Sequence, residues 1–116
     1  MQTEEIQSRD WPMFLAEFSR EHRGETCSVV TLGAFVGGQR IAEHTPLLTV
    51  AAEPSCRAAS KIEVLCAGDV PAANIAYDIA SPTRVFLARG EDGQEVALEI
   101  ESDDVGRTVI CLEDAK

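Results

Sequence analysis

The fold class is decided by one stretch, residues 84–101, which reads RVFLARGEDGQEVALEIE. In the second arm apolar and polar side chains largely alternate, which is the period-two pattern of a strand with one buried face. The first arm is an apolar run between two arginines, and the set of positions that includes Arg84 is expected to face outward. Val85 and Leu87 face the core in the first arm, and Val96, Leu98 and Ile100 face it in the second. The arms are joined by a four-residue turn, GEDG, and a parallel crossover would need a dozen or more residues. The stretch therefore predicts an antiparallel hairpin.

The same kind of pattern continues in both directions from this hairpin. Runs rich in β-branched or alternating apolar residues predict further strands at 26–32, 39–43, 47–52, 61–66, 74–79 and 108–112. The pair Thr45-Pro46 is expected to separate the strands 39–43 and 47–52. Short connections containing Gly, Pro or Asp lie between most of these runs, so the region 25–112 is predicted to be antiparallel.

Only one stretch, residues 10–23, has helical periodicity. Its apolar or aromatic positions recur at i, i+3, i+4, i+7 and i+11, namely Trp11, Phe14, Leu15, Phe18 and His22. Asp10 is predicted to be the N-cap, and Gly24 the glycine that ends the helix. The aromatic face is expected to be buried against the sheet, with His22 at the negative end of the helix dipole.

Together these elements predict an α+β fold that is mainly β. One N-terminal helix packs on a curved antiparallel sheet, or on a small open barrel, of about seven strands. The length of 116 residues fits a single domain, 1–116.

Charge and segment lengths exclude several classes of partner. The formal charge is −10, with twenty acidic and ten basic side chains, which argues against binding to nucleic acid and to anionic membranes. The longest uncharged run, 26–39, has 14 residues, and a membrane span needs about 18 or more. The acidic start, residues 1–5, lacks the pattern of a signal peptide. We therefore expect a cytoplasmic protein.

The four cysteines, at positions 27, 56, 66 and 111, form no Cys-x-x-Cys pair. Neither a zinc site nor a redox pair is indicated, and reduced, mostly buried thiols are expected. Cys56 is the one candidate for a reactive thiol, because Arg57 follows it in a predicted loop and an adjacent cation lowers the pKa of a thiol. An incidental exposed thiol is the simpler interpretation.

The motifs of catalysis and cofactor binding are incomplete. The glycine-rich run 33–38 lacks the Lys-Ser/Thr of a phosphate-binding loop, so a turn between strands is the better interpretation. The acidic run 101–106 resembles a calcium loop, but Val105 and Leu112 occupy two positions that need oxygen ligands. No catalytic residue, metal or cofactor is predicted.

Several short motifs resemble a known family. They are WP at 11–12, Phe14, FSR at 18–20, HRG at 22–24, PTRV at 82–85 with Leu87, and ALEIES at 97–102. These residues are similar to a family of short bacterial proteins known only as a domain of unknown function (5335). The resemblance runs from Ile6 to Leu112 and implies a bacterial, single-domain protein. It implies no activity and no site residues.

Two classes of function stay open. The first is a non-catalytic module that binds another protein or forms a homodimer, with Phe86 as the interface candidate because it has the parity of Arg84, opposite to Val85 and Leu87. The alternative is a small-ligand-binding or enzymatic barrel, with a site between helix and sheet. Its residues would be Trp11, His22, Tyr77 and Arg84.

Overall fold

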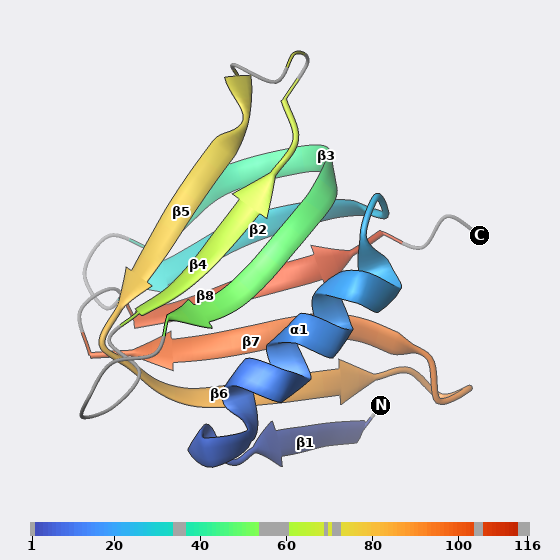
Figure 1. The fold of residues 1–116 in the computed structure, drawn as a ribbon, viewed down its shortest axis with the longest axis vertical. Helices are drawn as coiled ribbons and strands as arrows, with labels where there is room; N and C mark the ends of the chain where they lie inside the picture. Colours follow the sequence, from blue (N-terminus) through green and yellow to red (C-terminus); the bar gives the residue numbers. More distant parts are fainter. Residues whose placement is uncertain are drawn as a thin grey trace.

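One helix lies across the concave face of a curved, eight-stranded antiparallel sheet (Figure 1). The computed structural model describes residues 2–33, 37–53, 61–68, 70, 73–103 and 106–113. The elements are, in chain order, β1 (Gln2–Ile6), the 3-10 turn η1 (Ser8–Asp10), α1 (Trp11–His22), β2 (Thr26–Gly33), β3 (Gly37–Glu53), β4 (Lys61–Cys66), β5 (Ile75–Ala80), β6 (Pro82–Arg89), β7 (Glu95–Ser102) and β8 (Gly106–Leu112).

The strands follow the order β1-β6-β7-β8-β2-β3-β4-β5, and every neighbouring pair is antiparallel. The sheet is open, so β1 and β5 are its two edges. The predicted helix on a curved antiparallel sheet is confirmed, including the hairpin of β6 and β7. Strands joined by short connections pair antiparallel, because a parallel pair needs a longer crossover.

The first edge strand, β1, was not predicted. Its sequence, QTEEI, has no apolar alternation, because four of its five residues are exposed. It pairs with β6, and two ion pairs link the strands: Glu4 with Arg89 at 2.8 Å, and Glu5 with Arg84 at 3.1 Å. The pairing of β1 with β6 therefore involves opposite charges on the two strands and no apolar periodicity in β1.

The predicted strands 39–43 and 47–52 are wrong as separate elements, since β3 is one strand of 17 residues. Fully extended, such a strand would span about 56 Å, whereas the longest dimension of the molecule is 38 Å. The strand therefore bends. His44 has a φ of 54°, and the register with β2 shifts nearby. The bend lets the first half of β3 pair with β2 and the second half with β4.

The helix begins after Asp10 and ends close to Gly24, as predicted. Gly24 has a φ of 87°, a conformation that favours glycine, and its N–H donates to the carbonyl of Leu47. The expected N-cap bond of Asp10 is absent, because Asp10 already has helical dihedral angles as the last residue of η1. The helix spans Trp11–His22, and Arg23 is extended.

The core lies between the helix and the concave face of the sheet. Trp11, Leu15 and Phe18 are buried there, while Phe14 is only half-buried. Val85 and Leu87 are buried as their parity predicts. The buried thiols of Cys27 and Cys66 lie 3.9 Å apart.

Cys111 corrects the expectation of buried thiols. It is exposed, because its neighbour Ile110 takes the inward position of β8. Within the described ranges, no helix combines the length and the apolar character needed to cross a membrane.

Candidate functional site

The four residues of the predicted ligand site do not come together. Trp11 is buried at the start of the helix, and its indole N–H donates to the carbonyl of Ile6 at 2.9 Å. His22 is eleven residues away, about 16 Å along the helix axis. Arg84 lies on the convex face of β6, because Val85 takes the inward position, and Tyr77 lies half-buried on the edge strand β5. The four side chains therefore lie in separate parts of the molecule and do not form one site.

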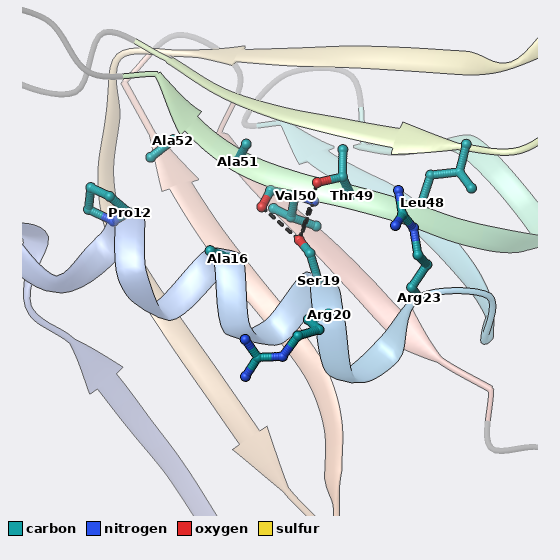
Figure 2. A pocket seen from close by; sticks show the side chains of 10 residues that line it. All are labelled: Pro12, Ala16, Ser19, Arg20, Arg23, Leu48, Thr49, Val50, Ala51 and Ala52. Atoms are coloured by element: carbon teal, nitrogen blue, oxygen red, sulfur yellow. Dashed lines mark hydrogen bonds between the residues drawn. The ribbon is translucent and has the colours of Figure 1, made fainter.

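A different groove occupies the junction of helix and sheet (Figure 2). It has a volume of about 330 Å³. Its lining comes from the exposed side of α1, from Arg23 and from the second half of β3: Pro12, Ala16, Ser19, Arg20, Arg23, Leu48, Thr49, Val50, Ala51 and Ala52. We call this the α1–β3 groove.

Ser19 holds the two walls of this groove together. Its hydroxyl donates to the carbonyl of Val50 at 2.9 Å and accepts from the Val50 N–H at 2.7 Å, as the dashed lines of Figure 2 show. β2 pairs with β3 only as far as Pro46, so beyond that point α1 takes the place of a strand beside β3. A helix residue thus satisfies backbone groups that would otherwise be buried without a partner.

The charged side chains that line the groove are both arginines. Arg20 has one exposed contact with Glu17, at 3.7 Å, and no ion pair joins Arg23 to another described residue. In a chain with twice as many acidic as basic residues, this is a local excess of positive charge. An anionic group in the groove would find guanidinium donors at its rim.

Sequence reasoning missed this groove. Pro12, Ala16, Ser19 and Arg23 repeat at i, i+4, i+7 and i+11, which is a second helical stripe beside the aromatic one. Small residues along such a stripe permit close approach of a neighbouring element. That spacing is the signal by which the groove could have been found.

A second cluster surrounds His22 at the end of the helix. Its Nδ1 lies 3.0 Å from Glu25 and its Nε2 2.7 Å from Glu95, and only 12% of the side chain is exposed. Burial lowers the pKa of His22, but the hydrogen bonds to Glu95 and Glu25 together outweigh it, so the pKa lies above its usual value. The arrangement suits an imidazolium that donates to two carboxylates.

The same cluster contains three groups that could hold a metal ion. Donor atoms of Glu21, His22 and Glu95 lie within 4.8 Å of one another. A metal there would have to replace the proton between His22 and Glu95, and Arg89 adds positive charge 3.8 Å from Glu95. The protonated histidine satisfies Glu95, one of these two carboxylates, without an ion.

We predict that His22 makes stability fall as the pH rises above about 6.5. Since its pKa is higher in the folded chain than the value near 6.5 of the unfolded chain, the folded state holds more protons between the two values. The stabilisation is complete below pH 6.5 and disappears as the pH rises through the folded pKa. The measurement is the free energy of urea unfolding as a function of pH in a His44→Gln variant, where His22 is the remaining histidine. This free energy should decrease with rising pH across the range, and we call that decrease the slope.

Removing the second histidine provides the control. In His22→Gln/His44→Gln the slope between pH 6.5 and the folded pKa should vanish. A slope that survives in this double variant would contradict the assignment to His22.

The other predicted site residues have the following positions. Phe86 is half-buried on the convex face of the sheet, and the Arg84 guanidinium lies 4.9 Å from the centre of its ring. In the register it stands between Glu5 of β1 and Glu99 of β7. It stays an interface candidate. Cys56 lies outside the described residues.

Comparison with protein families places the chain. The model of the family of unknown function DUF5335 matches residues 2–116. The chain belongs to DUF5335. The family description names no activity, so the short motifs around Trp11, Pro82 and Ala97 now have an identified family but no assigned role. Comparison with curated proteins and with solved structures found no match.

Proposed function

We propose that the protein is a non-catalytic binding module that takes an acidic, partly apolar segment of a partner protein in its α1–β3 groove. The observation that carries the proposal is the charge of the groove: both charged lining residues are arginines, in a chain of net charge −10. Complementary charge at a rim raises association rates and selects among partners.

The walls suit a segment with apolar side chains. Alanine, proline, leucine and valine make up much of the lining, while Ser19 and Thr49 add polar groups. Ser19 ties α1 to β3 through two hydrogen bonds, so the groove exists before a partner arrives. A preformed site avoids part of the entropy cost of binding.

The chemistry of the lining supports a non-catalytic role. Its ten residues include no histidine, cysteine or carboxylate to act as a base or nucleophile. The Ser19 hydroxyl is engaged on both sides by Val50, so it has no base to activate it.

The ligand-binding alternative keeps one supporting observation. The groove lies between helix and sheet, where that alternative expects its site, although other residues line it. A free organic anion could use the same arginines. The test must therefore separate an acidic segment from a small carboxylate.

NMR titration of the ¹⁵N-labelled protein makes this separation. The probes are a synthetic peptide of alternating glutamate and leucine, the matched peptide with lysine in place of glutamate, and hexanoate. We expect the acidic peptide alone to shift the amide signals of Ala16, Arg20, Arg23 and residues 49–52. Saturation by hexanoate at the same concentrations would favour the small-ligand alternative, and no shift with any probe would refute the proposal.

Charge reversal tests the two arginines. Arg20→Glu/Arg23→Glu should weaken binding of the acidic peptide at least about tenfold, because it replaces two attractive contacts by repulsive ones. Arg9→Glu is the control, since Arg9 is exposed in η1 and does not line the groove. Arg9→Glu should leave the affinity for the acidic peptide almost unchanged. If each reversed charge lowers that affinity equally in Arg9→Glu and in the groove variant, the attraction is a general electrostatic one and does not come from the groove.

A further inference from the structure

The two edges of the open sheet differ in how they are protected. β1 presents two glutamates, each in an ion pair with an arginine of β6, and charges on an edge strand discourage pairing with another chain. β5, which reads IAYDIA, has one charge and contains no proline or lysine. Its register with β4 is continuous from Ile75 to Ala80, without a bulge. This edge lacks the usual devices that prevent strand pairing.

The outer side of β5 is also unpaired within the described part of the chain. β5 pairs with β4 alone among the described strands, and no described backbone–backbone hydrogen bond outside the sheet involves its residues. At its last residue, the carbonyl of Ala80 accepts a hydrogen bond from the Ser102 hydroxyl at 2.5 Å. Ile75 and Tyr77 are half-buried on the inner face, next to the core. Alternate positions Ala76, Asp78 and Ala80 are exposed on the other face.

A second copy of β5 is complementary to the first when the two-fold axis passes through Tyr77. Antiparallel pairing about a two-fold axis must match inner with inner side chains. With the axis at Tyr77, Ile75 lies opposite Ile79 of the second copy, Tyr77 opposite its own copy, and Ala76 opposite Asp78. With the axis at Asp78, that carboxylate would lie opposite its own copy, and like charges directly opposite are destabilising.

We infer that the protein forms a homodimer in which the β5 edges of two copies pair antiparallel about Tyr77, joining their sheets into one. The pairing adds main-chain hydrogen bonds and a tyrosine pair, and it extends the inner row of Ile75, Tyr77 and Ile79 across the axis. Asp78 keeps its salt bridge with Lys61, at 3.2 Å, and faces only alanine of the other copy. The α1–β3 groove is lined by α1, Arg23 and β3, so this interface uses other residues than the proposed binding site.

Two opposite charges at one exposed position test the register. In the wild type, analytical ultracentrifugation should give a dimer. Ala76→Asp places a carboxylate opposite Asp78 twice per dimer, and the dissociation constant should rise at least about tenfold. Ala76→Lys places a cation there instead, and the dimer should persist or tighten. Ala76 is exposed, so both variants should keep the fold, which circular dichroism can verify.

The contrary outcomes are equally clear. A monomeric wild type overturns the inference, and so does an equal effect of Ala76→Asp and Ala76→Lys. A dimer that resists Ala76→Asp but dissociates on Phe86→Ser would place the interface on the convex face around Phe86 instead.

Discussion

Phe18→Ala should lower the free energy of unfolding by about 3–5 kcal/mol. The Phe18 side chain is 2% exposed and contacts two neighbours on the helix, with ring centres 6.1 Å from Phe14 and 4.6 Å from His22. Truncation removes its buried surface and leaves a cavity between helix and sheet. Urea denaturation followed by circular dichroism measures the loss, which is a large part of the stability of a chain of this length.

Met13→Ala is the matched control for this prediction. Met13 lies on the same helix but is 75% exposed, so its truncation should change the free energy of unfolding by no more than about 0.5 kcal/mol. Similar losses in both variants would mean that helix propensity, rather than packing on the sheet, determines the effect.

Ser19→Ala should cost about 1–3 kcal/mol although it removes a single oxygen atom. The hydroxyl is the described partner of both the N–H and the carbonyl of Val50, a residue without exposed surface. Without it, two backbone groups face a methyl group beside the core. Hydrogen exchange of the Val50 amide should accelerate in the variant, which distinguishes this cause from a general loss of helix stability.

The control for Ser19 is Ser8→Ala. Ser8 is exposed in η1, and its side chain has no described hydrogen bond, so the variant should unfold like the wild type. An unchanged exchange rate at Val50 in Ser19→Ala would contradict the proposed role of the hydroxyl.

Much of the fold could be predicted because burial imposes a period on the sequence. The inward positions of Val85, Leu87, Leu98 and Ile100 are confirmed, and Gly24 ends the helix through its positive φ. Val96 and Phe14, predicted to face the core as well, are only half-buried. β1 was not predicted because its pairing involves ion pairs, and charged residues give no apolar alternation in the sequence. The continuous, bent strand β3 was not predicted because a proline inside an alternating run, here Pro46, usually marks a break between strands.

The candidate site was harder to predict than the fold. A groove exists where side chains are small, and alanines such as Ala16 and Ala51 have no pattern that points to a ligand. Arg20 and Arg23 resemble ordinary helix-surface charges until β3 is placed beside them. Trp11 and Arg84 of the predicted ligand set lie apart for a related reason, since residue types suited to binding can lie on opposite faces of one sheet.

The bent strand β3 has a consequence for how the molecule unfolds. In the strand order, β3 lies between β2 and β4 and pairs with both. The part of the sheet that ends at β2 and the part that begins at β4 are therefore connected through the backbone of β3. Loss of the second half of β3, which pairs with β4, would also release the groove wall that Ser19 holds. We therefore expect amides of β2 and β4, which touch no common strand but this one, to exchange with the same free energy, as parts of one cooperative unit.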